Sequence, residues 1–193
     1  MKKFLGAVLA VVLGAVSLFA GDAEDIKALL IKDLELGASG DFAGALALRT
    51  PDFVETTDLG TFTVEHTKWM ILALDGKHPE EFLLLSAAIE SRGAFKKPTP
   101  EQMARIREAA RDPEFLQWYA KNIPVVLANI KDDCALQLKT LKFVGIKVEG
   151  DSATAVIEFD HKNPEGVRHR SGTVFLRKVD GKWMICRAVI GAK

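Results

Sequence analysis

The chain has 193 residues, and its 26 lysines and arginines balance 26 aspartates and glutamates, so the formal net charge is zero. Hydrophobic residues make up 48% of the chain and charged residues 27%, which is a globular composition. These values exclude a disordered chain, a coiled coil and a disulfide-dense miniprotein. Because a basic excess is missing, we predict no nucleic-acid partner.

The first twenty residues have the pattern of a secretory signal peptide. Lys2 and Lys3 precede an uncharged, mainly apolar run from Phe4 to Ala20, and acidic residues follow it. This run is at the short limit for a membrane span, so cleavage near Ala20 is favoured over an uncleaved anchor helix. We therefore predict an exported protein, periplasmic or extracellular. Its mature part, 21–193, is expected to form a single domain without stable membrane insertion.

The first part of the mature chain predicts two helices and a hairpin. Apolar residues recur at helical spacing over 24–36. A short helix is expected over 41–49, with Asp41 as its N-cap and Pro51 ending it. Residues 53–64 favour two short strands around a turn, and a further helix is expected to run from there to about residue 74.

The middle of the chain is predicted to be helical. Proline at a first-turn position starts a helix over 79–91, and a capping box at Thr99 starts another over 100–111. A third helix is expected over 113–122. Because proline removes a backbone donor, Pro124 is expected to interrupt it, with a last short helix running to about residue 132.

The last third of the chain changes to the period of strands. Four strands are predicted over 136–148, 152–161, 167–179 and 182–190. Apolar and polar residues alternate in the second of them, where Ala153, Ala155, Ile157 and Phe159 share one face. This alternation is typical of a half-buried antiparallel sheet.

Two stretches of the chain resemble the nuclear transport factor 2-like superfamily, which includes SnoaL-like proteins and ketosteroid isomerase. One runs from Gly40-Asp41-Phe42 through Asp52-Phe53-Val54 to Leu59-Gly60-Thr61, and the other combines 148–156 with 175–185, including Asp180-Gly181-Lys182-Trp183. The resemblance implies an α+β fold in which N-terminal helices pack on a strongly curved, mostly antiparallel sheet, forming a cone with a cavity. Residues 76–134 are longer than the usual connection and are expected to add extra helices.

The resemblance also suggests candidates for catalysis. Isomerase chemistry of this kind needs a carboxylate base and acidic donors in an apolar cavity, and Asp52, His66 and Tyr119 could supply them. The alternative is that Asp52 is a turn former after Pro51 and that His66 is a surface side chain beside a core tryptophan. Because recognised metal and cofactor motifs are missing, we predict no metal site and no cofactor.

A second set of residues is a candidate for ligand binding. Trp69 shares a helix face with His66, and residues 161–193 carry a net charge of +6. Arg168 and Arg170 lie on one face of a strand, and Arg187 belongs to the same basic region. These arginines could attract an anionic ligand or an acidic partner. The alternative is that they form an ordinary solvated sheet face.

The resemblance implies that the two cysteines do not pair. It places Cys134 just before one outer strand and Cys186 in a strand three steps away, about 14 Å across the sheet. A disulfide needs Cα atoms within about 7 Å. We therefore predict that both thiols are free and largely buried.

Three hypotheses about function stay open at this point. The first is an exported binding or accessory protein for a small apolar or anionic ligand, without catalysis. The second is a cofactor-free isomerase, dehydratase or hydrolase that works in the cavity. The third is a protein–protein interaction module that docks a partner protein or a second copy of this chain, forming a homodimer.

Overall fold

The computed structural model describes the backbone of residues 2–163 and 165–192, and side chains from residue 21 to residue 162 and from 165 to 191. The elements and their bounds, in chain order, are α1 (Lys2–Ser39), α2 (Phe42–Ala47), β1 (Arg49–Thr57), β2 (Gly60–Thr63), α3 (Val64–Leu74), α4 (Pro79–Glu90), α5 (Pro100–Ala109), α6 (Pro113–Thr140), β3 (Lys142–Glu149), β4 (Ser152–Asn163), β5 (Gly166–Val179) and β6 (Lys182–Ala192).

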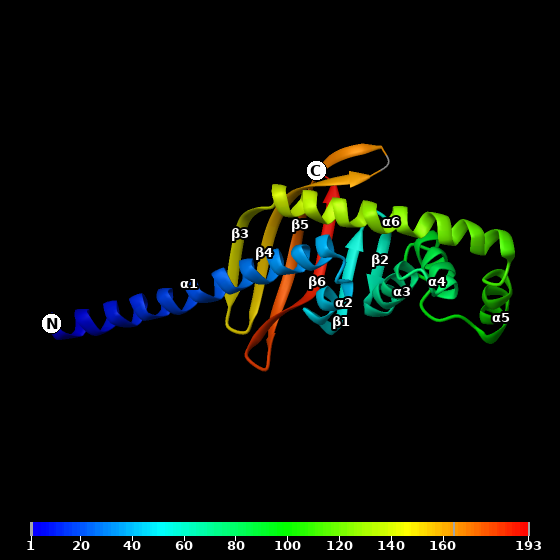
Figure 1. Ribbon diagram of the computed structural model, residues 1–193. Helices are drawn as coiled ribbons and strands as arrows, with labels where there is room; N and C mark the ends of the chain where they lie inside the picture. The colour runs from blue at the N-terminus through cyan, green and yellow to red at the C-terminus, as the bar shows by residue number, and fades with distance from the viewer. Residues whose placement is uncertain (1, 164, 193) are drawn as a thin grey trace.

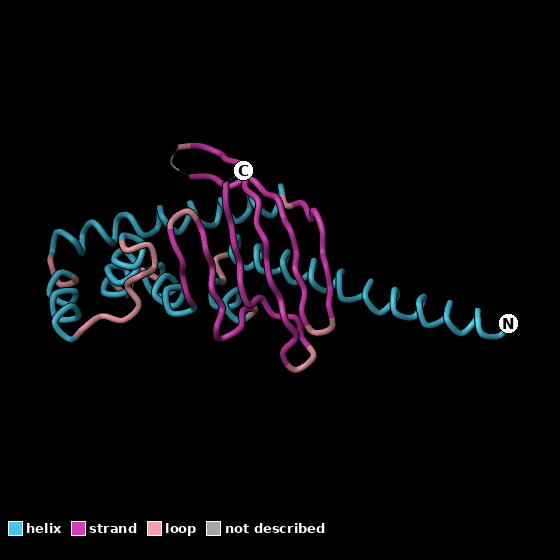
Figure 2. Tube along the Cα trace, turned by 180° about the vertical axis from the view of Figure 1, so that it is seen from behind, coloured by secondary structure: helices cyan, strands magenta, loops and turns pink. Residues whose placement is uncertain are grey.

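The six strands form one curved sheet in the order β2-β1-β6-β5-β4-β3. All neighbouring strands are antiparallel except β1 and β6, which pair in parallel. Helices α1 and α6 pack against each other and lie over one face of the sheet (Figure 1), and the opposite face is seen from behind in Figure 2. This arrangement confirms the predicted α+β fold with helices on a curved, mostly antiparallel sheet.

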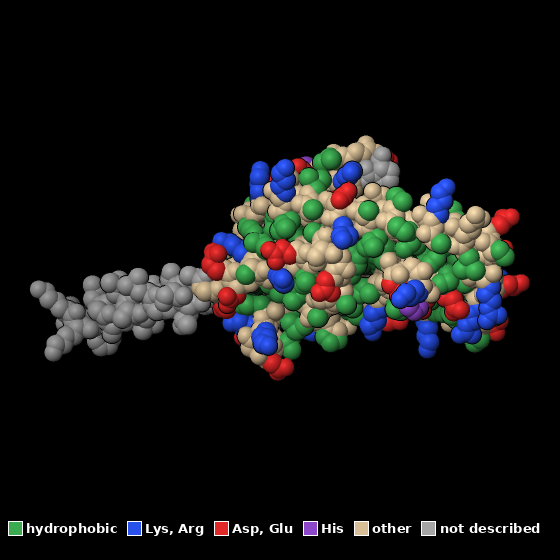
Figure 3. Space-filling view, viewed as in Figure 1, with side chains coloured by type: hydrophobic (Ala, Val, Ile, Leu, Met, Phe, Trp, Pro, Cys, Tyr) green, Lys and Arg blue, Asp and Glu red, His purple; other side chains and the backbone are tan. Residues whose placement is uncertain are grey.

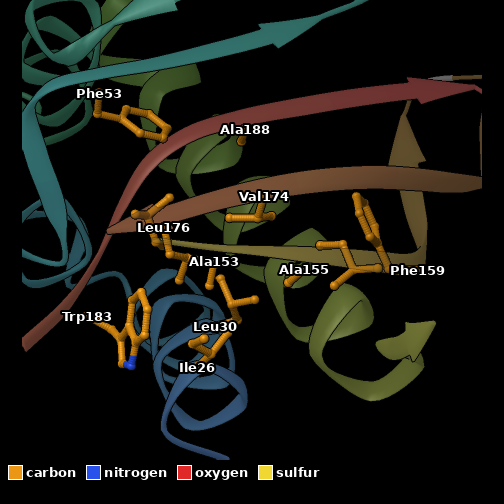
Figure 4. Close-up of a cluster of buried hydrophobic side chains, with 12 residues drawn as sticks. Ile26, Leu30, Phe53, Ala153, Ala155, Phe159, Val174, Leu176, Trp183 and Ala188 are labelled. Carbon is orange, nitrogen blue, oxygen red and sulfur yellow. The ribbon is translucent and has the colours of Figure 1, made fainter. Parts of the chain in front are cut away.

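The main core lies between α1 and the inner face of the sheet. Ile26 and Leu30 of α1 are almost fully buried there against Leu176 and Trp183 of the last two strands (Figure 4). The predicted apolar face of β4 is also buried, since Ala153, Ala155, Ile157 and Phe159 all belong to this core. Strand alternation alone therefore identified the face of β4 that packs against the helices.

Beyond the β2 edge of the sheet, α3, α4, α5 and the first half of α6 form a separate group of helices (Figure 1). Its small core is built from Trp69, Leu84 and Ala88. The capping box predicted at Thr99 is present, since the backbone N–H of Thr99 donates to the Gln102 side chain at 2.8 Å and the Gln102 N–H donates back at 3.2 Å.

The predicted break at Pro124 is wrong, because α6 is one continuous helix of 28 residues. Pro124 lies on the exposed side of α6, and so does Ala120, whose carbonyl loses its helical donor and can bind water instead. Tyr119 and Ile123 on the inner side are each only 2% exposed, so packing holds both halves of the helix in line. Residues 136–140, expected in a strand, belong to this helix, and β3 starts at Lys142.

Strand β1 begins earlier than the sequence indicated. Helix α2 has the predicted N-cap, because the Asp41 carboxylate accepts from the Gly44 N–H at 2.8 Å. It ends at Ala47, and β1 starts at Arg49 and runs through Pro51. The pairing of β1 with β6 shifts register between Arg49 and Val54, and such an irregularity accommodates a proline that cannot donate to the ladder.

Among the residues that the structure describes with their side chains, no helix is both long enough and apolar enough to cross a bilayer.

Candidate functional site

A pocket of about 480 Å³ opens between the sheet and the two covering helices. Its walls come from α1, β1, β4, β5, β6 and the C-terminal end of α6. Most of the lining is apolar and includes Leu30, Leu34, Phe53, Ile157, Phe159 and Val174. The volume and the apolar walls are typical of a site for a small organic molecule.

A cluster of charged side chains, Asp33, Arg49 and Glu55, lies in the wall of this pocket. Arg49 donates to Asp33 Oδ2 at 2.9 Å, and these two side chains are only 18% and 17% exposed. The guanidinium of Arg49 also stands 5.1 Å from the ring centre of Phe53. We call these three charged residues the acid–arginine cluster.

The two carboxylates of the acid–arginine cluster are harder to ionise than in water. Burial raises the pKa of Asp33, although Arg49 acts to lower it. Burial likewise raises the pKa of Glu55, with Arg49 opposing the shift and Asp33 adding to it. One guanidinium therefore acts on the pKa of both carboxylates in a largely apolar setting, where charge is poorly solvated.

The second oxygen of Asp33 is unusual. Oδ1 is buried and has no hydrogen-bond partner among the described residues. Buried polar atoms in folded proteins are nearly always hydrogen-bonded, and an unsatisfied one costs about 1–3 kcal/mol. Because Asp33 lines the pocket, a molecule bound there could supply the missing donor.

His161 provides a further polar group in the pocket, and Asp133 of α6 orients it. A carboxylate can only accept, so the 2.8 Å contact from His161 Nδ1 to Asp133 Oδ2 places the proton on Nδ1. Asp133 also accepts from Gln137 Nε2 and from the Lys162 N–H, each at 2.7 Å. The imidazole is therefore held by a carboxylate that is itself fixed by two other donors.

An ion pair between Arg170 of β5 and Asp58 of the β1–β2 turn lies at the outer part of the pocket. The Arg170 side chain is 12% exposed and that of Asp58 is 50% exposed. The pair spans β6, which lies between β1 and β5 in the sheet. Arg170 was predicted to bind a ligand, and the structure places it in the pocket wall with its charge already paired.

The three predicted catalytic residues do not come together in the structure, and the lining formed by the described residues includes none of them. Asp52 is exposed and accepts from Arg177 at 2.6 Å. His66 is 1% exposed; its Nδ1 accepts from the Thr63 N–H at 3.1 Å and its Nε2 donates to the Phe95 carbonyl at 2.8 Å.

Tyr119, the third of these residues, is buried and donates to the Ala73 carbonyl at 2.5 Å. This bond ties α6 to the last turn of α3 and leaves the hydroxyl no donor for a substrate. The geometry of His66 and Tyr119 is that of structural side chains, and a catalytic role for these three residues stays a prediction.

The other predicted ligand-binding residues lie away from the described lining of the pocket. Trp69 is buried in the core of the helical group. Arg168 is exposed and pairs with Glu165 near the β4–β5 turn. Arg187 is exposed and stands 5.5 Å from the ring centre of Phe175.

Both cysteines are free thiols in the structure. Burial, reinforced by Asp133 and Asp33, raises the pKa of Cys134 to about 11. Burial also raises the pKa of Cys186. Because the thiolate is the reactive form, both side chains are poor nucleophiles at neutral pH.

Three polar residues of the pocket were not predicted as site residues, although a local pattern in the sequence marks each of them. Asp33 occupies the apolar stripe of α1, three residues after Leu30 and one before Leu34. Glu55 lies two residues after buried Phe53, so strand alternation points it inward. His161 likewise continues the buried face of β4. An acidic or imidazole side chain on an otherwise apolar face was therefore the sequence signal that could have identified these pocket residues.

Across the described residues, no group of three or more histidine, cysteine, aspartate or glutamate side chains is arranged to hold a metal ion. The site is thus built from an apolar pocket and a few charged or polar side chains. Such a lining suits the apolar part of an organic molecule and offers polar groups that would orient its polar end.

Helices packed over a curved, mostly antiparallel sheet match the α+β fold that the resemblance to the nuclear transport factor 2-like superfamily implied. Several solved structures are similar to this chain in fold. One is an NTF2-like protein with a cystatin-like fold from Novosphingobium aromaticivorans, 15% identical, with a TM-score of 0.49 over 93% of this chain and 87% of that one. Another is an NTF2-like protein of unknown function from Shewanella oneidensis, 16% identical, with a TM-score of 0.45 over 88% and 98%.

A third similar structure is an NTF2-like protein of unknown function from Shewanella baltica, 13% identical, with a TM-score of 0.44 over 89% of this chain and 94% of that one. These likenesses concern the fold alone. No protein-family model and no curated protein matches the sequence.

Proposed function

We propose that this protein binds a small, mainly apolar organic molecule in the pocket between α1, α6 and the sheet, and that it does so outside the cytoplasm. The single observation that carries the proposal is the pocket itself, about 480 Å³ with largely apolar walls and a few convergent polar groups. The signal-peptide pattern of residues 1–20 supports the exported location.

A pocket-filling variant tests this function. Ala188 lines the pocket and is 8% exposed, so Ala188→Phe would place a ring in the ligand's space. Native mass spectrometry of the protein purified from its own host should show a retained small molecule. We expect Ala188→Phe to lose that mass.

The matched control is Val156→Phe, which adds a ring on the outer face of the sheet, where Val156 is 37% exposed. It should keep the ligand, and both variants should remain folded by circular dichroism. Equal retention by both variants, or a wild-type protein that carries nothing and binds nothing, would rule out the pocket as a ligand site.

A second candidate function is acid–base catalysis in the same pocket. The observation that favours it is that Asp33, Glu55 and His161 all line one largely apolar space, an arrangement suited to proton transfer. A cofactor-free isomerase or dehydratase of this kind should exchange protons next to the carbonyl of small apolar ketones in D₂O. Proton NMR would detect the exchange, and Glu55→Gln with wild-type rates would argue against the acid–arginine cluster as the base.

A further inference from the structure

The acid–arginine cluster has one carboxylate more than its guanidinium can neutralise. Arg170, the other guanidinium in the pocket wall, is paired with Asp58. His161 is hydrogen-bonded to Asp133. Among the described residues of the pocket wall, Arg49 is therefore the one guanidinium left for two carboxylates, Asp33 and Glu55, and with both ionised the cluster would carry a net charge of −1.

The cluster also has one hydrogen-bond acceptor without a donor. Arg49 satisfies one oxygen of Asp33, whereas the buried Oδ1 has no donor among the described residues. Asp33 Oδ1 thus lacks a hydrogen-bond donor, and the cluster lacks one positive charge when both carboxylates are ionised. A protonated amine supplies both in one group, because an ammonium carries three N–H donors and one positive charge.

The remainder of the pocket suits the hydrocarbon part of such a molecule. Leu30, Leu34 and Phe53 are near the cluster in sequence and line the same space, and Ile157 and Phe159 add apolar area from β4. Burying this apolar surface favours binding through the hydrophobic effect. Because the apolar walls and the acid–arginine cluster share one pocket, the ligand is expected to be amphipathic.

We propose that the pocket takes a small apolar primary amine, with its ammonium group between Asp33 and Glu55 and its hydrocarbon part against the apolar walls. This inference rests on the proposed binding function and specifies its ligand. It departs from the anionic ligand expected from the basic C-terminal region, since the arginine of that region that lines the pocket is already paired with Asp58.

Three probes of nearly equal shape test the inference: cyclohexylmethylamine, cyclohexylmethanol and cyclohexanecarboxylate. Their affinities would be measured by isothermal titration calorimetry at pH 8, after removal of any retained ligand. We expect the wild-type protein to bind the amine at least about tenfold more tightly than the alcohol or the carboxylate, as a charge-assisted hydrogen bond in an apolar site implies.

Two variants assign the effect to the cluster. Glu55→Gln removes one negative charge with little change of shape and should weaken amine binding about tenfold without weakening alcohol binding. Asp33→Asn should act in the same direction. Glu35→Gln is the matched control on α1, since the Glu35 side chain is 50% exposed and its contact is with Lys32, and it should leave all three affinities unchanged.

The outcomes separate this inference from the function on which it rests. If the alcohol or the carboxylate binds as tightly as the amine, the amine assignment is overturned and the pocket remains a binding site. The same holds if Glu55→Gln, folded by circular dichroism, binds the amine like wild type. If none of the three probes binds, the amine assignment also fails, and the retained-ligand experiment decides the binding function separately.

Discussion

The buried polar side chains among the described residues fall into two kinds: those whose polar atoms have hydrogen-bond partners, and those in which at least one atom has none. His66 and Tyr119 are buried with backbone partners on the atoms that catalysis would need. Asp33 and Glu55 line the pocket together with Arg49, which is ion-paired with Asp33. Residue type alone pointed to the first pair, but Asp33 keeps the capacity to interact with a ligand, because its buried Oδ1 has no hydrogen-bond partner among the described residues.

The raised pKa of Glu55 leads to a prediction about stability. Burial is its main cause, and Arg49 opposes the shift while Asp33 adds to it. Since the folded protein then holds this proton more tightly than the unfolded chain does, its stability falls as the pH rises from about 4.3, the unfolded value, through the folded value. Glu55→Gln removes the ionisable group and should therefore be more stable than wild type at pH 8.

Urea unfolding at pH 3 and pH 8 would measure this difference. At pH 3 wild-type Glu55 is protonated in both states, so the advantage of Glu55→Gln should largely disappear. Glu35→Gln should show no such pH dependence, because Glu35 is half-exposed beside Lys32. If Glu55→Gln were more stable than wild type by the same amount at both pH values, the raised pKa of Glu55 would not be the cause of the difference.

Among the elements, the contact between α1 and α6 depends on a glycine. Gly37 is buried in the last turns of α1, and a Cβ atom built there would lie 2.7 Å from Sγ and 3.3 Å from Cβ of Cys134. The absence of a side chain thus lets the two helices approach closely. Both helices contribute residues to the pocket wall, so this contact bears on the shape of the pocket.

A double-mutant cycle tests this contact. Gly37→Ala should destabilise the wild-type protein by about 1–2 kcal/mol, since overpacking forces Cys134 to move. In a Cys134→Ala background the same change should become neutral or stabilising, because alanine is favoured over glycine in a helix by up to about 1 kcal/mol. Urea unfolding would give the four stabilities, and a Gly37→Ala effect of equal size in both backgrounds would show that the helices do not meet there.

At the scale of the whole molecule, two cores share one chain. The cone core lies under α1, and the helical group beyond β2 has its own core. They are joined where the Thr61 N–H of β2 donates to the Arg92 carbonyl at 3.1 Å. Gly93 follows with φ of +81°, and a Cβ there would lie 1.8 Å from the Thr61 carbonyl oxygen, so this joint depends on glycine.

The surface of the helical group is where the interaction hypothesis would apply. Trp118 and Val125 of α6 are 47% and 58% exposed, and hydrophobic side chains are interspersed with charged ones on the face that carries this helix (Figure 3). Exposed apolar side chains are common on proteins without partners. A docking or dimer role for this surface therefore stays a prediction.

The sequence alone determined the local features of this protein. Caps at Asp41 and Thr99 and alternation in β4 act within a few residues, so their patterns identify elements and inner faces correctly. Tertiary structure decided the rest. Packing carries α6 through Pro124, and the curvature of the sheet under α1 brings Asp33 to Arg49, sixteen positions apart. Which charged groups face one another depends on how distant elements pack, and no local pattern specifies that.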